Sequence, residues 1–294
     1  MPERKKLDQD NYKEILPYFA YSPRYMSLAK FSTQYIWRHQ TGLEYYILDD
    51  MLFLFESKFN DSAVCPMGPG DLKKAVDHIF CNEKTGIIYC IGKEQKIILE
   101  ESYPVVPYRD FFEYVYFTKD QVELKGRRYN KKRNHINKFH SLYQHEYKRI
   151  DCHDHEEIRK VIGKWCENSD FGDEALSCEK NAITELLSNE VDIGCKAASV
   201  YINGKMVAFT IGEQIFPDMV VVHFEKADTE FQGLYQTMAR EYLANEWPDI
   251  KYVNRQEDMG IPGLRKAKES YYPEFYVENH CIRKEGQVHQ ALSL

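Results

Sequence analysis

Residues 124–140 read LKGRRYNKKRNHINKFH, a basic stretch that separates two halves of the chain. It contains seven basic residues and no acid, within 294 residues whose formal net charge is -7. The seven are Lys125, Arg127, Arg128, Lys131, Lys132, Arg133 and Lys138. Apolar residues follow a helical spacing after Gly126, so one face of a helix can pack while the other presents cations. These apolar residues are Tyr129, Ile136, Phe139 and Tyr143.

A cationic helix is suited to bind phosphate, because Lys and Arg form charge-assisted hydrogen bonds with phosphate oxygens. We therefore predict that the seven basic residues, together with Asn134, bind a polyanionic substrate. The alternative is a solvated basic helix that only links the two halves.

Composition indicates a globular protein. Hydrophobic residues make up 43% and aromatic residues 14% of the chain, which is enough for two cores of about 100 to 150 residues each. The first residues, MPERKKLDQDNYKE, lack the apolar region of a signal peptide, and no stretch approaches the roughly 18 apolar residues of a membrane-spanning helix. We expect a cytoplasmic protein.

The eight cysteines show no CxxC pair, as expected for reduced thiols in a cytosolic protein. The run Cys152-His153-Asp154-His155 could supply metal ligands. Adjacent residues rarely converge on one tetrahedral ion, however, and the same residues suit a polar turn before a helix. We predict that no metal is bound.

The first half is predicted to form helices, a hairpin, and then helix, strand, helix and strand. Its hairpin spans Leu43 to Glu56, with a tight turn at Asp49-Asp50. The flanking elements are helices near 10–20 and 30–40, a helix after Asp71, a strand at 86–91, a helix near 93–101 and a strand at 111–117.

The second half is predicted to form a strand, two helices, three strands, and then helix, strand, helix and strand. Asn203-Gly204 joins two of its strands and is the strongest hairpin signal in the chain. The predicted strands lie at 145–150, 196–214 (a hairpin), 219–226, 251–255 and 274–283, and the helices at 157–166, 174–189, 231–247 and 262–272.

This order is that of the GCN5-related N-acetyltransferase (GNAT) fold, and the first half follows it with looser ends. The predicted fold class is α/β (α+β), with two tandem GNAT-like domains that each contain a mixed twisted sheet flanked by helices. We expect an N-terminal domain at 1–122, a basic connecting helix at 123–144 and a C-terminal domain at 145–294.

Two stretches carry a resemblance to a known family: ELKGRRYNKKRNHINKF at 123–139 and RQEDMGIPGLRKAKESYYP at 255–273. Together they resemble the phosphatidylglycerol lysyltransferase C-terminal domains, a largely uncharacterised bacterial family similar to the Fem-type aminoacyltransferases. The resemblance extends over nearly the whole chain.

The resemblance implies two GNAT-like domains and an acyl-group transferase that takes an aminoacyl group from a charged tRNA. Characterised members place that group on a lipid head group, and they carry a multi-helix membrane region before this domain. Nothing precedes the domain in this sequence, so the acceptor is left open, as is peripheral contact with a membrane. No cofactor is implied for this reaction.

The second stretch reads as a strand-to-helix junction. Pro262 suits the first turn of a helix, and Arg265 and Lys268 follow on it. Because ligands of α/β sheets bind beyond the carboxyl ends of strands, we predict Arg255 and Asp258 as catalytic residues and Arg265 and Lys268 as substrate-binding residues. The structural alternative is a set of ion pairs that brace the junction.

Glu225, near the end of a predicted strand, and Tyr271, after the last predicted helix, are candidates for general base and general acid. GNAT enzymes often use a strand glutamate and a tyrosine in these roles, so this assignment rests on fold analogy. Each residue is also explicable as a structural one.

Neither half shows a clear site for coenzyme A. Residues 67–71, MGPGD, lie where a GNAT fold binds pyrophosphate, but Asp71 is better explained as the cap of the next helix. Residues 230–234, EFQGL, lack the glycine-rich pattern of acetyl-CoA-binding members.

The leading hypothesis is therefore an aminoacyltransferase with an aminoacyl-tRNA donor and an amine or hydroxyl acceptor. The first alternative is a GNAT-type N-acetyltransferase that uses acetyl-CoA or another acyl-CoA thioester, whose phosphates the same cations would bind. The second is a non-catalytic nucleic-acid-binding module.

Overall fold

The computed structural model describes residues 2–59, 61–150, 173–187 and 193–284. Three features predicted above lie outside these ranges: the Cys152–His155 run, the helix at 157–166, and the tail from 285. The chain forms two compact units. The first comprises Met1–Glu113, Glu257–Ile261 and Tyr276–Leu294, and the second comprises Tyr114–Gln256 and Pro262–Phe275.

The sheet of the first unit has the strand order β1-β2-β3-β4-β5-β14-β6. Only the β4/β5 step is parallel, and the helix α4 (Leu72–Asn82) forms its crossover. The strands are β1 (Lys5–Lys6), β2 (Leu43–Leu48), β3 (Met51–Glu56), β4 (Ser62–Met67), β5 (Ile87–Ile91), β6 (Val106–Pro107) and β14 (His280–Arg283).

The sheet of the second unit has the strand order β13-β7-β12-β11-β10-β9-β8. Its parallel step is β11/β12, and α10 (Leu234–Glu246) forms the crossover. The strands are β7 (Glu113–Phe117), β8 (Glu146–Ile150), β9 (Lys196–Ile202), β10 (Lys205–Phe216), β11 (Met219–Ala227), β12 (Tyr252–Asn254) and β13 (Phe275–Val277). Both sheets thus share one plan, and the predicted fold class of two mixed sheets flanked by helices is confirmed.

The two units exchange strands, which the predicted domains did not anticipate. β7 comes from the first half of the sequence but pairs antiparallel with β12, whereas β14 comes from the second half and pairs antiparallel with β5. Each pairs with the outer strand of a parallel pair: β7 with β12 of β11/β12, and β14 with β5 of β4/β5. The observed boundary therefore lies at 113/114, the basic helix lies inside the second unit, and the predicted last strand is divided between β13 and β14 in different sheets.

Short helices accompany the first sheet. They are α1 (Tyr12–Ile15), η1 (Leu16–Tyr21), α2 (Phe31–Ile36), α3 (Arg38–Thr41), α5 (Lys93–Leu99) and η2 (Arg109–Phe111). The first four replace the two longer helices expected before the hairpin, and α5 matches the helix predicted near 93–101. The helix α4 packs Ala75, Val76 and Ile79 into a core with Phe53 and Phe55 of β3. Burial of this apolar face explains its helical spacing.

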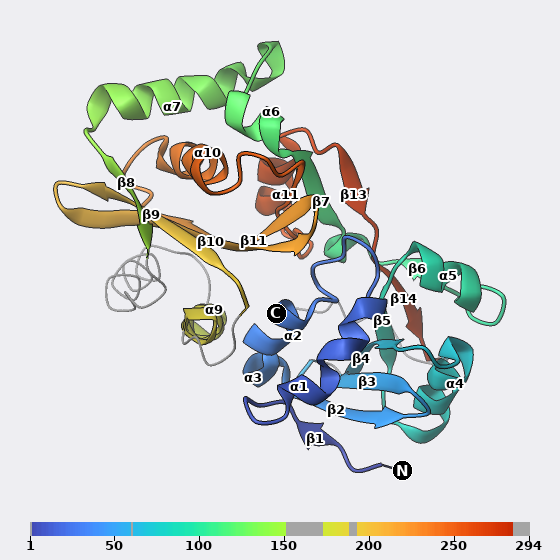
Figure 1. Cartoon of the computed structure of the whole chain (residues 1–294). Coiled ribbons are helices and arrows are strands. Elements are labelled where there is room, and N and C mark those ends of the chain that lie inside the picture. The colour runs from blue at the N-terminus through green and yellow to red at the C-terminus, as the bar shows by residue number, and fades with distance from the viewer. Residues whose placement is uncertain (1, 60, 151–172, 188–192, 285–294) are drawn as a thin grey trace. The chain divides into compact units, whose positions relative to one another are not determined.

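In the second unit, α10 lies on one face of the sheet and α9 (Asp173–Leu187) on the other (Figure 1). The basic helix α7 (Asn130–Leu142) packs on α10 and is preceded by α6 (Thr118–Glu123) and η3 (Arg127–Tyr129). Its predicted apolar face is confirmed, because Ile136 and Phe139 are buried. The last helix of this unit is α11 (Pro262–Glu269).

Both predicted hairpin turns are confirmed. Asp49 and Asp50 have φ values of 49° and 59°, and Asn203 and Gly204 have values of 52° and 74°, as two-residue turns of the primed type require. The strand β4 was missed, because Pro66 within it is atypical of an inner strand. Among the described helices, none is long and apolar enough to cross a membrane.

Candidate active site

The site begins at the carboxyl ends of the parallel strands β11 and β12. Glu225 lies near the end of β11, and Arg255 follows β12 directly. Arg255 Nη2 donates a hydrogen bond of 2.6 Å to Glu225 Oε1, and their side chains are only 18% and 11% exposed. This pair and Tyr271, which contacts Arg255, are three of the four residues predicted to be catalytic.

The helix α11 and the residues after it bring a second cation and an aromatic ring to this pair. Lys268 Nζ donates to the backbone carbonyl of Arg255 at 2.6 Å, and Tyr116 donates from its hydroxyl to the carbonyl of Lys268 at 2.8 Å. The Arg255 guanidinium carbon lies 5.1 Å from the ring centroid of Tyr271. Lys268 therefore holds the backbone of Arg255 in place, while Tyr271 covers its guanidinium.

The basic helix α7 contributes Lys132 to the same cluster. Lys132 Nζ lies 3.7 Å from the ring centroid of Tyr271 and donates to Ser270 Oγ at 2.7 Å. Ser270 in turn donates to the carbonyl of Ala267 at 2.6 Å. We call Lys132, Glu225, Arg255, Lys268 and Tyr271 the α11 cluster.

Burial sets the protonation of the central pair. It raises the pKa of Glu225, and the charge of Arg255 opposes that shift. Burial also disfavours a charged Arg255, but the nearby Glu225 and Tyr271 outweigh this effect and raise the pKa of the guanidinium. Arg255 is therefore a permanent cation, and Glu225 accepts a proton more readily than an exposed glutamate.

The other two titratable groups are also shifted. Burial, with a smaller effect from the positive charge of Arg255, lowers the pKa of Lys132 to about 8. Burial raises the pKa of Tyr271 to about 12, although the charge of Arg255 opposes this. Lys132 and Tyr271 are both only partly buried, so the cluster is open to solvent on the side where they lie.

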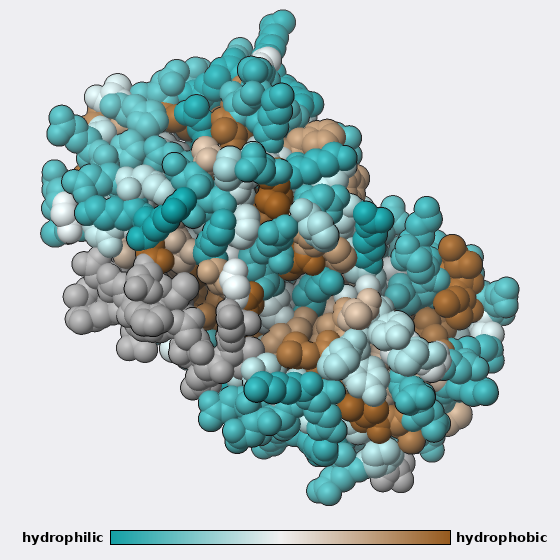
Figure 2. Space-filling model, in the orientation of Figure 1, coloured by the Kyte–Doolittle hydropathy of each residue, from teal (hydrophilic) through white to brown (hydrophobic). Residues whose placement is uncertain are grey.

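The remaining predicted phosphate-binding residues of 125–138 lie on the surface, which is hydrophilic over α7 in Figure 2. Lys125 pairs with Glu123 at 2.9 Å and Arg128 with Asp120 at 2.8 Å. Arg133 donates to the backbone carbonyl of Gly126 at 2.8 Å. The exposed side chains of Arg127, Lys131, Asn134 and Lys138 make no ion pair or hydrogen bond with any described residue.

Asp258, predicted to be catalytic, belongs to the first unit and is fully buried at 0% exposure. Its carboxylate accepts hydrogen bonds from Arg109 Nη1 at 3.1 Å and from the backbone N–H of Gly260 at 2.9 Å. Met259 and Gly260 have positive φ values of 51° and 74°, so the aspartate braces a strained turn. Its catalytic role stays a prediction.

Arg265 lies on α11 and is partly buried. The sequence interpretation missed Ser270, Tyr116 and Arg109, which contact Lys132, Lys268 and Asp258 respectively. Ser270 stands beside the predicted Tyr271, and this proximity was the only sequence signal for it. Tyr116 and Arg109 lie more than 100 residues away from their partners along the chain, and no local pattern could have indicated them.

An oxygen atom of the protein lies close to each of the two helix N-termini where a GNAT fold binds pyrophosphate. In the first unit Asp71 caps α4, because its Oδ1 accepts from the N–H of Lys74 at 3.1 Å, and this bond lowers the pKa of Asp71. In the second unit Gly233 precedes α10, and a Cβ added there would lie 2.2 Å from the carbonyl oxygen of His135 on α7. The predicted cap at Asp71 is confirmed, and α7 lies against the start of α10.

Metal ligands are not clustered in the part of the chain that is described, where no group of three or more His, Cys, Asp or Glu residues could hold an ion. The candidate site is therefore built from cations, one carboxylate and one phenol. Such groups bind and polarise an acyl ester by charge and hydrogen bonding.

Comparison with known proteins identifies several relatives. A conserved protein of unknown function from Bacteroides thetaiotaomicron VPI-5482 has 30% sequence identity and a TM-score of 0.83, covering 97% of this chain and 100% of that one. An uncharacterised protein of Mycoplasmoides gallisepticum (strain R(low / passage 15 / clone 2)) is 26% identical over 175 residues, which are 58% of this chain and 55% of that protein. The chain thus spans about half the length of this curated relative.

Two further structures share the fold at low identity. L-PGS from Bacillus licheniformis has a TM-score of 0.66 at 13% identity, covering 98% of this chain and 95% of that one. A tandem GNAT protein from the clavulanic acid biosynthesis pathway has a TM-score of 0.51 at 8% identity, covering 96% and 98%. The profile of the family described as "Phosphatidylglycerol lysyltransferase, C-terminal" matches residues 19–283. With its two GNAT-like units, this chain belongs to the phosphatidylglycerol lysyltransferase C-terminal family.

Proposed function

We propose that this protein is an acyl-group transferase that moves an aminoacyl group from a charged tRNA to an amine or hydroxyl acceptor. The observation that carries this proposal is the double role of α7. Its exposed face presents Lys131 and Lys138 without described partners, and its inner face delivers Lys132 to the α11 cluster. Arg127, on the preceding η3, is also exposed without a described partner. The helix α7 can thus contact the RNA backbone on one face and the aminoacyl ester at the end of the tRNA on the other.

Family membership supports transfer of an acyl group, because the family is named after the C-terminal part of a lysyltransferase, and a lysyl group is an acyl group. The protein oxygens close to these two helix N-termini favour an aminoacyl-tRNA over a CoA thioester. Asp71 places a carboxylate, and the carbonyl of His135 places a partial negative charge, where each GNAT-like unit would otherwise attract pyrophosphate. An RNA donor needs neither position.

The α11 cluster supplies the groups that acyl transfer requires. The acceptor nitrogen or oxygen attacks the ester carbon, a new C–N or C–O bond forms, and the ester bond to the ribose oxygen breaks. Arg255 and protonated Lys132 stabilise the developing oxyanion. Glu225 takes the proton of the acceptor, and Tyr271 donates a proton to the departing ribose oxygen. Lys268 positions Arg255 through its backbone.

The acceptor is a lipid head group or a soluble amine or hydroxyl compound. A charged tRNA as donor places the reaction in the cytoplasm, and a lipid acceptor would require contact with the membrane surface. The α11 cluster contains no element specific to either acceptor.

A binding assay on the intact protein separates the donor classes. Thermal stabilisation by aminoacyl-tRNA but not by uncharged tRNA supports the proposal, since a ligand that binds only the folded state stabilises it. Stabilisation by acetyl-CoA alone would overturn it in favour of an acyl-CoA transferase. Equal stabilisation by any RNA, without transfer of a labelled aminoacyl group, would make the protein a nucleic-acid-binding module.

A pair of variants tests the role of α7. Lys131→Gln with Lys138→Gln should weaken tRNA binding and reduce the slope of log K against log salt by roughly 0.7 to 0.9 for each phosphate that is no longer neutralised. The matched control is Lys73→Gln with Lys74→Gln on α4, which removes the same charge from another exposed helix. If both double variants have equal effects, α7 does not bind the donor.

A further inference from the structure

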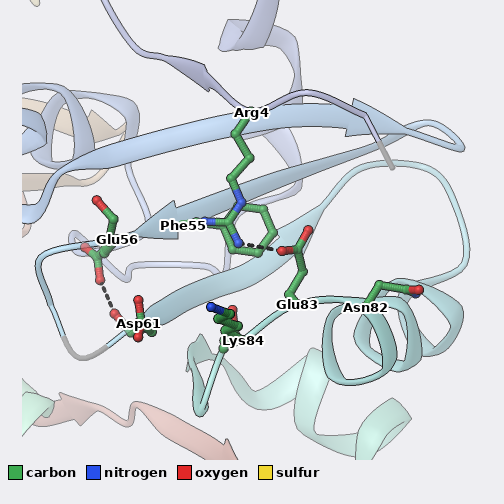
Figure 3. Close-up of a pocket in the computed structure, with 10 residues that line it drawn as sticks. Arg4, Phe55, Glu56, Asp61, Asn82, Glu83 and Lys84 are labelled. Carbon is green, nitrogen blue, oxygen red and sulfur yellow. Dashed lines mark hydrogen bonds and ion pairs between the residues drawn. The ribbon is translucent and has the colours of Figure 1, made fainter.

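The first unit contains a pocket of about 310 Å³ beside the carboxyl end of β3 and the amino ends of β4 and β5, which are inner strands of its sheet (Figure 3). Glu56, Asp61 and Lys84 contribute to its lining. The Asp71 turn follows the opposite, carboxyl end of β4. The pocket is thus separate from the position where a GNAT fold binds its acyl donor.

Glu56 is the buried group of this pocket, with 3% exposure. Its Oε2 accepts hydrogen bonds from Ser62 Oγ at 2.7 Å and from the hydroxyl of Tyr89 at 2.9 Å. No described residue donates to its Oε1. Burial raises the pKa of Glu56 to about 7, although both hydrogen bonds oppose the shift. Oε1 is therefore the oxygen of this carboxylate that can accept hydrogen bonds from a donor that enters the pocket.

Of the other charged side chains that line the pocket, Arg4 and Glu83 form an ion pair with each other, whereas Asp61 and Lys84 do not pair with a described residue. Arg4 forms an ion pair of 2.7 Å with Glu83, and its guanidinium carbon lies 3.8 Å from the ring centroid of Phe55. Figure 3 shows the Arg4 side chain over Phe55, with its guanidinium directed at Glu83. Asp61 and Lys84 are exposed and form no ion pair with any described residue. The pocket therefore offers one buried acid, one acid at the rim and one base at the rim.

We propose that this pocket binds the primary ammonium group of a small organic molecule of about amino-acid size, with the ammonium against Glu56. An ammonium has three N–H donors, and its charge compensates a buried carboxylate. The volume is at the lower end of the roughly 300 to 1,000 Å³ of small-molecule sites, which limits the size of the ligand.

The rim distinguishes two sources of that ammonium group. In a free α-amino acid the carboxylate would pair with Lys84, whereas in a diamine the second ammonium would pair with Asp61. The two kinds of ligand therefore depend on different rim residues and share their dependence on Glu56. This inference does not rest on the proposed transfer reaction.

The test is a titration of the intact protein with L-alanine, putrescine and acetate, followed by NMR chemical shifts or calorimetry. Saturable binding of L-alanine or putrescine, but not of acetate, is expected. Glu56→Gln should weaken that binding tenfold or more, because it keeps the shape and removes the charge. The matched control is Glu94→Gln, an exposed glutamate on α5 outside the pocket, which should bind as the unmodified protein does.

The rim variants complete the test. Lys84→Gln should weaken only L-alanine and Asp61→Asn only putrescine, and both substitutions are at exposed positions that leave the fold intact. If Glu56→Gln does not fold, unchanged affinity of both rim variants for both probes overturns the proposal. Lack of saturable binding of either probe up to about 10 mM, or binding of acetate alone, overturns it as well.

Discussion

Arg255 Nη2 lies 2.6 Å from Glu225 Oε1, which joins a residue after β12 to one near the end of β11. Both side chains are more than four-fifths buried, so each charge has lost most of its hydration and depends on the other. This pair is the centre of the α11 cluster, because Tyr271 and Lys268 contact Arg255 and Lys132 contacts Tyr271.

Glu225→Gln is expected to destabilise the protein by about 3 to 5 kcal/mol, because the Arg255 guanidinium would stay buried without a counter-charge. Urea unfolding measures the change. The double variant with Arg255→Met removes both charges and should recover a large part of the loss. A single variant as stable as the unmodified protein would show that the pair contributes little.

The lowered pKa of Lys132 predicts a pH dependence of stability. The ordinary value of 10.5 in the unfolded chain falls to about 8 in the folded protein, so the folded state binds fewer protons between these pH values. The contribution of Lys132 to the free energy of unfolding should therefore rise as the pH increases from about 8 to about 10.5.

Urea unfolding of the protein and of Lys132→Met across that pH range tests this prediction. The rise should be smaller in the variant. Arg255→Met should shift the rise toward higher pH, because the positive charge of Arg255 lowers the pKa of Lys132. Identical pH profiles for the protein and Lys132→Met would contradict the prediction. Lys73→Met, an exposed lysine of α4, is the matched control.

Asp258→Asn separates a catalytic from a structural role at this position. If the role is structural, the free energy of unfolding should fall by about 1 to 3 kcal/mol, because Arg109 and the N–H of Gly260 would donate to a weaker acceptor. Transfer activity would then be retained in the folded fraction. The catalytic expectation is a roughly 100-fold loss of transfer at a near-normal melting temperature. Melting temperature and turnover are measured on the same preparation. Full activity in a destabilised variant ends the catalytic assignment.

Gly233→Ala should destabilise the protein more than Gly204→Ala does. Both glycines have positive φ values, 90° and 74°, and so both variants carry the strain of a left-handed side chain. Only at Gly233 would the new Cβ also meet a backbone atom, the His135 oxygen at 2.2 Å, whereas nothing lies within 4 Å of a Cβ at Gly204.

The difference in unfolding free energy between these two variants measures how closely α7 packs against the start of α10. Displacement of α7 should also weaken tRNA binding in Gly233→Ala alone. Equal unfolding free energies would show that the helix shifts without cost and that its carbonyl does not block the α10 N-terminus.

The sequence by itself determined the features that depend on neighbouring residues. The Asp49-Asp50 and Asn203-Gly204 turns follow from residues that tolerate positive φ, and the helix at 130–142 follows from the spacing of Ile136 and Phe139. The repeated order of helices and strands was enough to predict two GNAT-like units. Arg255 was selected through the rule that sites form beyond the carboxyl ends of strands, and Glu225 through analogy with GNAT enzymes, but the contact between them was not predicted.

Only the tertiary structure decided which distant residues became partners. β7 and β14 join the sheets of opposite halves because each fills the edge left beside a parallel strand pair, and no local signal specifies which free edge a strand will take. Lys132 points into the cluster while Lys131 remains in solvent, because helix packing on α10 fixes which face is inward. Asp258 is held by Arg109, 149 residues earlier in the chain, since charge pairing depends on distance in space and not along the sequence.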